Sequence, residues 1–167
     1  DFGDGEILTT GERDVTHVYS KPGTYTVTLE VSGMSLSKSR TDYVMILPKD
    51  IYVDPSCATP APPYGAWDTA ANYIEDALAV APEGATVWLR AGVRHNAKSK
   101  ARMALDRAIL VRGETGNPAD VEVANDSASA SVFWINHADA LLADMTVLGG
   151  KLNGTGSNGR SVHVGAS

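Results

Sequence analysis

Apolar and polar residues alternate with a period of two near the start of the chain. From residue 24 onward every second residue is apolar and falls on one face: Tyr25, Val27, Leu29 and Val31. Threonines and a glutamate occupy the opposite face, a pattern that is typical of a half-buried antiparallel strand. A Pro-Gly turn precedes this segment. Residues 33–39 are polar and predict a loop, and residues 43–47 predict a second strand.

A helical period replaces this alternation after a proline-rich segment. The apolar residues of 70–81 recur at intervals of three and four and fall on one face: Ala70, Tyr73, Ile74, Ala77, Leu78 and Ala81. Asp68 or Thr69 can cap the N-terminus of such a helix, and Pro82 and Gly84 follow its end. The spacing therefore predicts a helix over 70–81 whose apolar side covers a neighbouring element.

Three later segments, 86–92, 108–113 and 144–149, share a strand-like alternation and a closing glycine. Aligned on that glycine, they place two columns of apolar residues on the inward face: Val87, Ile109 and Met145, then Leu89, Val111 and Val147. Recurring strands of this kind predict the parallel rungs of a solenoid, with the 70–81 helix closing its first end. Further short strands are expected at 121–123, 132–135 and 161–164.

The first part of the chain carries two motifs of a known family. The turn DFGDG at residues 1–5, followed by HVYSKPGTYTVTLEV at 17–31, resembles the second half of a PKD (polycystic-kidney-disease-type) domain, an immunoglobulin-like β-sandwich. The first strands of that family are absent, which implies that the chain is a fragment of a longer protein. Asp1 and Asp4 could bind calcium, but two carboxylates in a glycine turn are expected to stabilise the turn instead.

The second part resembles a different family. APPYGAWDTAANYIEDA, GATVWLRAG and AILVRGETGNP are similar to the N-terminal coils of right-handed parallel β-helix proteins of the pectin-lyase-like superfold. This superfold is common in large secreted bacterial proteins, often beside PKD domains. The two resemblances imply a mainly β chain: a partial sandwich at 1–48, a linker with a leading strand at 49–63, and a β-helix with an N-terminal capping helix at 64–167. They also imply an extracellular or cell-surface location.

Composition excludes several other classes. The net charge of -6 argues against general nucleic-acid binding. No apolar run approaches the roughly 18 residues of a membrane span, so membrane insertion is not expected. Cys57 is the single cysteine, so the chain forms no internal disulfide. The pattern makes no prediction of oligomeric state.

One segment departs from the acidic average. Residues 90–112 hold seven of the fourteen basic residues and one acid, Asp106, so their charge is about +6 while that of the remainder is about -12. The simpler interpretation is a solvated surface that discourages aggregation. The alternative is a strip that binds an acidic polysaccharide, with Arg90 and Arg112 one rung apart. The candidate residues for that strip are Arg90, Lys98, Lys100, Arg102 and Arg112.

Candidate catalytic groups are few. The acid or base side chains near strands are His137, Asp139, Asp144 and His163, and no catalytic, metal or cofactor site is assigned apart from the calcium alternative. The favoured function is a non-catalytic extracellular module, a PKD spacer joined to a β-helix with a carbohydrate-binding or adhesive surface. The alternative is a polysaccharide lyase or glycoside hydrolase whose catalytic coils lie downstream.

Overall fold

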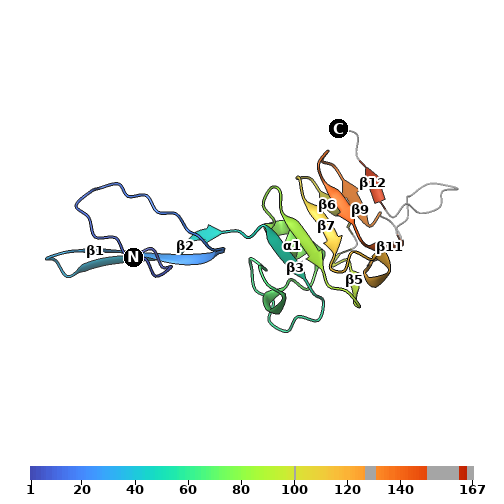
Figure 1. Ribbon diagram of the computed structural model, residues 1–167, viewed down its shortest axis with the longest axis horizontal. Helices are drawn as coiled ribbons and strands as arrows, with labels where there is room; N and C mark the ends of the chain where they lie inside the picture. The colour runs from blue at the N-terminus through green and yellow to red at the C-terminus, as the bar shows by residue number, and fades with distance from the viewer. Residues whose placement is uncertain (100, 127–130, 150–161, 165–167) are drawn as a thin grey trace. The chain divides into compact units, whose positions relative to one another are not determined.

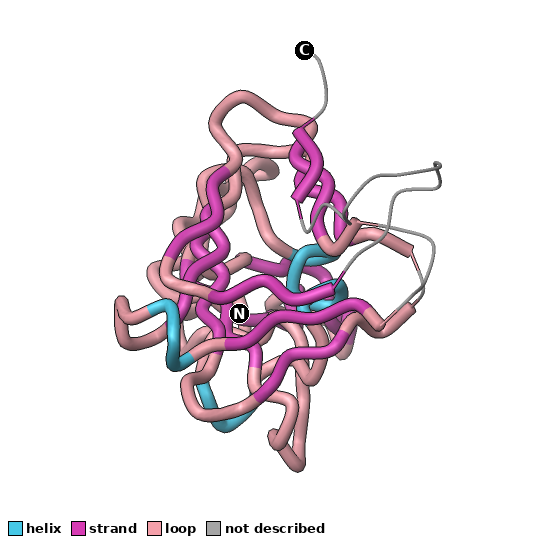
Figure 2. Tube along the Cα trace, turned by 90° about the vertical axis from the view of Figure 1, so that its right-hand side faces the viewer, coloured by secondary structure: helices cyan, strands magenta, loops and turns pink. Residues whose placement is uncertain are grey.

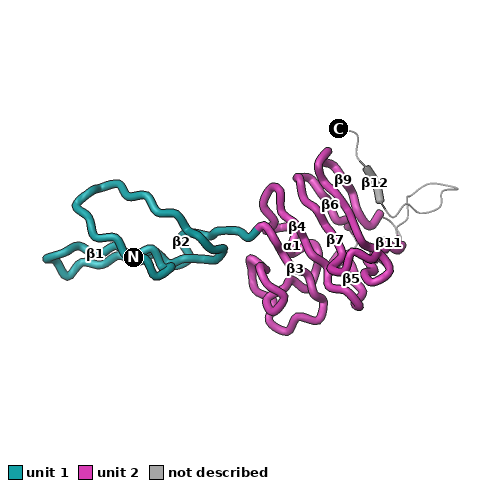
Figure 3. Tube along the Cα trace, viewed as in Figure 1, with its two compact units in different colours: residues 1–48 teal, residues 49–167 magenta. Residues whose placement is uncertain are grey.

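The computed structural model describes residues 1–99, 101–126, 131–149 and 162–164. The chain divides into two compact units, residues 1–48 and residues 49–167 (Figure 3). The described residues are mainly β, with one short α-helix. No helix among them has the length and apolar character that a membrane crossing requires.

Unit 1, residues 1–48, is built on an antiparallel hairpin of β1 (Gly23–Val31) and β2 (Leu36–Ile46) (Figure 1). The strand predicted from alternation at 24–31 is confirmed. The second strand begins at Leu36, seven residues before its predicted start, and its pairing with β1 shifts register between Tyr25 and Val27. Residues 36–43 are all exposed, so this part of β2 has no buried face whose pattern could have predicted it.

The start of unit 1 is held against β1 by aromatic rings and backbone hydrogen bonds. Four rings contact each other in sequence, with centroids 4.0, 4.6 and 4.4 Å apart: Phe2, His17, Tyr19 and Tyr25. Gly3 has φ +83° and lies against the backbone of β1, where a Cβ would be 2.3 Å from the carbonyl oxygen of Thr26. Only glycine therefore allows the turn to approach the strand so closely.

In unit 2, residues 49–167, the strands that the structure describes form three small parallel sheets. The first has the strand order β3 (Asp50–Val53), β4 (Thr86–Leu89), β7 (Leu110–Gly113), β10 (Leu141–Ala143). The second consists of β5 (Arg94–Asn96), β8 (Glu122–Asn125) and β11 (Thr146–Gly149). The third consists of β6 (Met103–Leu105), β9 (Phe133–Ile135) and β12 (Val162–Val164). A 3₁₀ turn, η2 (Pro118–Asp120), precedes β8.

The chain visits these sheets in a repeating order. β4, β5 and β6 belong to the first, second and third sheet, and β7 to β9 and then β10 to β12 follow in the same order. All of these pairings are parallel, so the predicted parallel pairing of the 86–90 and 108–112 segments is confirmed. In the view of Figure 2, the strands of successive passes lie over one another. Loops connect them at the corners.

The predicted register of the rungs is wrong. Val87 pairs with Val111 rather than with Ile109, and Leu89 pairs with Gly113. Because this shift is two residues, it keeps every side chain on its predicted face, and Ile109 and Val111 are both buried. The glycines used to align the repeats are not equivalent, because Gly113 lies within β7 while Gly92 follows the end of β4.

The segment predicted as the third rung lies in a different sheet from the first two. Met145 and Val147 lie at β11, which pairs with β8 in the second sheet, and the strand that follows β7 in the first sheet is β10. Gly113, one of the glycines used for the alignment, is required for a different reason: the backbone near Asp144 approaches it closely. A Cβ on Gly113 would be 2.1 Å from the carbonyl oxygen of Asp144, so the residue serves this contact and does not mark the end of a repeat.

The helix is shorter than predicted. α1 spans Ile74–Val80, and the 3₁₀ turn η1 (Trp67–Thr69) precedes it. Its N-cap residue is Tyr73, which makes no side-chain capping bond, so the expected caps Asp68 and Thr69 are wrong. The helix nevertheless covers the interior as predicted, because Ile74, Ala77 and Leu78 are buried in the core.

The segment around Ala71, which was predicted to be helical, instead forms backbone hydrogen bonds with the outer edge of the first sheet. The amide of Ala71 donates to the carbonyl of Tyr52 (2.9 Å), and the amide of Asp54 donates to the carbonyl of Ala71 (2.8 Å). The amide of Tyr52 donates to the carbonyl of Tyr64 (2.9 Å). An unpaired strand edge exposes backbone donors and acceptors, so these bonds explain why residues near 71 are extended.

The core of unit 2 lies between the three sheets and α1. Inward residues of the first sheet, such as Val87 and Leu89, are fully buried, as is Phe133 from the third sheet. His95 is the one histidine buried with them among the described residues, and its Nε2 lies 2.9 Å from the carbonyl oxygen of Arg90. Residues of alternating burial on short parallel strands thus form one continuous interior.

Candidate functional site

The outer face of the first sheet carries two rows of large polar and aromatic side chains. Tyr52, Trp88 and Arg112 are register partners on β3, β4 and β7, and each is half-buried. Arg90, which follows β4, lies between two carboxylates, Asp54 and Glu114. Arg90 and Arg112 are therefore not stacked as predicted, because the two-residue change of register places Trp88 beside Arg112.

Arg90 is held from both sides. Its Nε donates to Asp54 Oδ2 and its Nη1 donates to Glu114 Oε1, both at 3.2 Å. The guanidinium also covers the ring of Trp67, with its Cζ 4.2 Å from the ring centroid, and Trp67 contacts Tyr52. A planar cation between two carboxylates and a ring fixes the geometry of this row.

The pKa values of this row reflect those contacts. Burial favours a higher pKa for Asp54, but hydrogen bonds from Ser56 and Arg90 outweigh it and hold the pKa below its usual value. Burial likewise opposes the charge of Arg90, and its hydrogen bond to Asp54 together with Glu114 raises the pKa of Arg90 above its usual value. Both groups remain ionised at neutral pH, so their charges largely compensate each other.

Arg112 also contacts both a carboxylate and an aromatic ring. Its Nη2 donates to Asp144 Oδ2, and its Cζ lies 5.0 Å from the centroid of the Trp88 ring. The indole N–H of Trp88 donates to Asp50 Oδ1 at 2.9 Å. Each cation on this sheet face is thus paired with at least one carboxylate.

Lys98 lies on the loop between β5 and β6, next to α1. Its Nζ donates to Asp76 Oδ1 at 2.6 Å and lies 5.7 Å from the centroid of the Tyr73 ring. The hydrogen bond to Asp76 raises the pKa of Lys98. Its backbone amide donates to Glu75 Oε1 at 2.7 Å, so this lysine also secures the loop to the helix.

Arg102 differs from the other candidates. Its guanidinium covers the Trp134 ring with its Cζ 3.7 Å from the ring centroid, and its side chain is exposed. Within the described ranges, it forms no ion pair with a carboxylate. Lys100, the fifth predicted strip residue, lies outside the described residues.

Two further arginines of the basic segment have structural contacts. Arg107 donates from Nη1 to the carbonyl of Ala81 and from Nη2 to the carbonyl of Leu78, both at 2.6 Å. It thereby satisfies backbone acceptors at the C-terminal end of α1. Arg94 pairs with Asp126 at 3.1 Å on the surface. Part of the positive charge between residues 90 and 112 therefore holds the fold together.

The described candidates for acid–base chemistry make local structural contacts. Asp144 is paired with Arg112, and His137 Nδ1 accepts a hydrogen bond from the backbone amide of Asp139. The side chain of His163 lies outside the described residues. Among residues that the structure describes, no three His, Cys, Asp or Glu side chains come together as metal ligands would.

The carboxylates of the first turn in unit 1 contact their own backbone. Asp1 Oδ1 accepts from the amide of Gly3 at 2.8 Å, and Asp4 Oδ1 accepts from the amide of Glu6 at 3.1 Å. Asp4 Oδ2 lies 2.7 Å from His17 Nε2, and this hydrogen bond lowers the pKa of Asp4. These contacts match the expected turn-stabilising role of the two aspartates.

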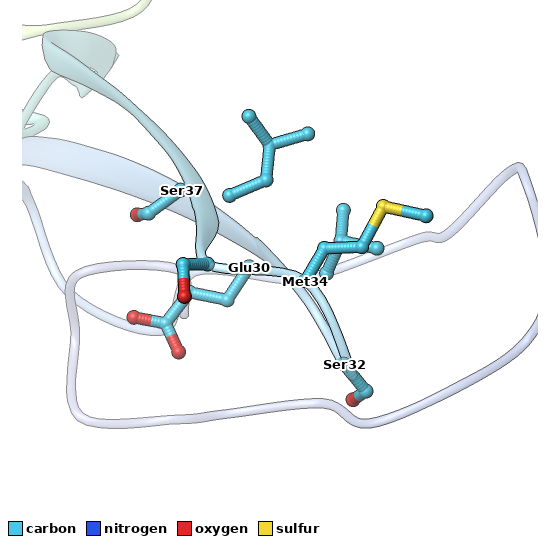
Figure 4. Close-up of a pocket in the computed structure, with 7 residues that line it drawn as sticks. Glu30, Ser32, Met34 and Ser37 are labelled. Atoms are coloured by element: carbon cyan, nitrogen blue, oxygen red, sulfur yellow. The ribbon is translucent and has the colours of Figure 1, made fainter.

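Unit 1 also contains two hollows on its hairpin. The larger, about 640 Å³, lies along β1, and its lining combines polar residues with the apolar side chains of Ile7, Leu8, Val15, Val27, Leu29 and Val31. The smaller, about 260 Å³, lies at the β1–β2 turn, where Figure 4 shows Glu30, Ser32, Met34 and Ser37. Neither brings together a group of acid and base side chains suited to catalysis.

The aromatic partners of the cations were missed by sequence reasoning. The sequence analysis assigned none of Trp67, Tyr73, Trp88 and Trp134 to a site. Each contacts one of the four described strip residues. The sequence did contain one indication of this site. Trp88 and Trp134 occupy outward positions on apolar strands, and a large ring at such a position needs a further contact partner.

Comparison with known proteins gives a family match for one part of the chain. The family model of the PKD domain matches residues 1–46. Comparisons with curated proteins and with solved structures find no significant match. The PKD part of the resemblance is thus confirmed, and a PKD domain is consistent with a multidomain extracellular or cell-surface protein.

Proposed function

We propose that unit 2 forms the first coils of a right-handed parallel β-helix and that the protein is a non-catalytic extracellular module. The order of strands supports the first statement, because each pass of the chain adds one strand to each of three parallel sheets. In this proposal the PKD domain is a spacer, and the coils present a surface that binds a carbohydrate.

The observation that carries the proposal is the pairing of cations with rings. Each of the four described strip residues lies over an aromatic ring on the outside of unit 2: Arg90 over Trp67, Lys98 over Tyr73, Arg102 over Trp134 and Arg112 over Trp88. Aromatic rings pack against the C–H faces of sugars, while guanidinium groups donate to carboxylates and hydroxyls. An acidic polysaccharide offers both kinds of partner.

The alternative proposal is a polysaccharide lyase or glycoside hydrolase whose catalytic coils lie downstream of residue 167. It rests on the resemblance of residues 51–167 to the pectin-lyase-like superfold. Release of unsaturated products from a polyuronate by a longer form of the protein would favour this alternative over the module.

The test of the module is binding by the whole 167-residue chain. Polygalacturonate and alginate are compared with a neutral glucan at low and high salt. We expect both acidic chains to bind more tightly than the glucan. Their affinity should fall with salt, because exposed charges are screened within about 8 Å at physiological ionic strength. Equal affinity for acidic and neutral chains, or a complete lack of binding, would refute an acidic-polysaccharide surface.

A further inference from the structure

Arg102 and Trp134 form a contact between neighbouring strands of the third sheet. Arg102 immediately precedes β6, and Trp134 is the central residue of β9. The two strands pair in parallel, with Ala104 opposite Trp134. This register places the guanidinium over the outward indole, with its Cζ 3.7 Å from the ring centroid.

The two side chains offer hydrogen-bond donors and no acceptors. A guanidinium has five N–H donors and an indole has one, and neither group accepts a hydrogen bond. Among the residues that the structure describes, Arg102 pairs with no carboxylate, and the indole N–H of Trp134 is buried and has no hydrogen-bond partner. The guanidinium of Arg102 is exposed, and with its unpaired donors and positive charge it is complementary to an anionic acceptor.

The other described strip residues are already compensated. Arg90 lies between Asp54 and Glu114, Arg112 is paired with Asp144, and Lys98 is paired with Asp76. An anion that approached any of them would compete with a carboxylate that the fold holds in place. Arg102 requires no such exchange, since its contact partner is a neutral ring.

We propose that Arg102 and Trp134 form the subsite that takes the carboxylate of a uronic acid residue, a statement that rests on the proposed glycan-binding function. The planar guanidinium binds both carboxylate oxygens, and the sugar ring lies beside the indole. Recognition of the carboxylate thus depends on this one pair, because the other described strip cations already have carboxylate partners.

The site is tested by the tryptophan indole signals of the ¹⁵N-labelled 167-residue chain. The chain has three tryptophans, and Trp134→Phe identifies the signal of the third. Galacturonate is titrated against galactose, its neutral counterpart. We expect galacturonate to shift the Trp134 signal and galactose to leave it in place. A shift confined to Trp67 or Trp88 overturns the subsite, and so does an equal response to both sugars.

Matched charge variants test the same subsite with polygalacturonate. Arg102→Ala should lower affinity by about tenfold or more, because hydrogen bonds to charged groups are lost. Arg94→Ala removes the same charge from an exposed surface pair and should change affinity by about twofold or less. Equal losses in the two variants overturn the subsite. Thermal unfolding checks that both variants remain folded.

The two proposals fail in different ways. If galacturonate shifts the Trp134 signal but the chain binds no polyuronate, the subsite is upheld and the glycan-binding surface is refuted. If polyuronate binds with normal salt dependence and Arg102→Ala has no effect, the surface is upheld and the subsite is refuted.

Discussion

The two units use the same alternation of apolar residues and reach different degrees of burial. In unit 2, Leu89 is completely buried beneath the neighbouring sheets. In unit 1, Leu29 occupies an equivalent alternating position on β1 and is 66% exposed, and Leu36 on β2 is 58% exposed. Alternation therefore determines which face of a strand is apolar, and the packing of other elements determines whether that face is buried.

The difference shows what stabilises each unit. A two-stranded hairpin alone is marginally stable in water, so unit 1 depends on the ring contacts and the DFGDG turn that hold its start against β1. Unit 2 has three sheets and a covering helix that share one interior. Matched substitutions in the two units therefore measure how much of the stability comes from enclosure.

The largest difference is expected for the same truncation at two leucines. Leu89→Ala removes a completely buried side chain and should cost about 2–5 kcal/mol of unfolding free energy. Leu29→Ala removes an exposed one and should cost about 0.5 kcal/mol or less. All three tryptophans lie in unit 2, so urea unfolding followed by tryptophan fluorescence reports on the first variant. Ring signals of Tyr19 and Tyr25 report on the second, and equal costs would contradict the comparison.

A smaller difference is expected for two arginines. Arg107→Ala leaves two carbonyl acceptors near the end of α1 without their donors and should cost about 1–2 kcal/mol. Arg40→Ala removes a contact with the exposed Tyr43 ring and should cost about 0.5–1 kcal/mol or less. Arg107→Lys keeps the charge but cannot reach both carbonyls at once. Full stability in that variant would show that charge alone is sufficient.

The smallest effect is the response to moderate acid. Burial lowers the pKa of His95 below its usual value near 6.5, despite its backbone hydrogen bond and the charge of Asp54. The unfolded chain therefore binds this proton more readily. The unfolding free energy of unit 2 should decrease below about pH 6.5, by at most about 1.4 kcal/mol per pH unit. His95→Gln should flatten this decrease in tryptophan-detected unfolding, and an unchanged slope would exclude His95 as its cause.

Unit 1 has a different acid response. The pKa of Asp4 is lowered by its hydrogen bond to His17, so its contribution is present above the ordinary carboxyl pKa and is lost as the pH falls through the lowered value. The stability that Asp4 contributes is therefore lost only below about pH 4. The contribution of Asp4 is therefore expected to remain while His95 already weakens unit 2.

Much of the fold followed from the period of the apolar residues. The strand at 24–31, the parallel pairing of β4 and β7, and the inward faces of Val87 and Leu89 were all predictable. The register was not, because a shift of two residues leaves the buried pattern unchanged. The strands β5, β6 and β10 were missed because they contain none of the β-branched and aromatic residues that are enriched in strands, Val, Ile, Thr, Phe, Tyr and Trp.

The candidate site was predictable in residue type but not in arrangement. Sequence reasoning found the cluster of basic residues at 90–112, yet their partners come from distant segments. Asp54, Glu114 and Asp144 meet the arginines only after the sheets are formed, and no local spacing encodes those meetings. The exceptional status of Arg102 therefore becomes visible only in three dimensions.

Backbone hydrogen bonds along the outer edge of β3 make the two edges of the first sheet of unit 2 unequal. Ala71 and Tyr64 occupy the donors and acceptors that a further strand would use on that side. Any lengthening of this sheet, by more coils or by a strand from another molecule, must therefore start from the β10 side. An assembly that grew by such strand addition would behave as a polymer with one permanently blocked end.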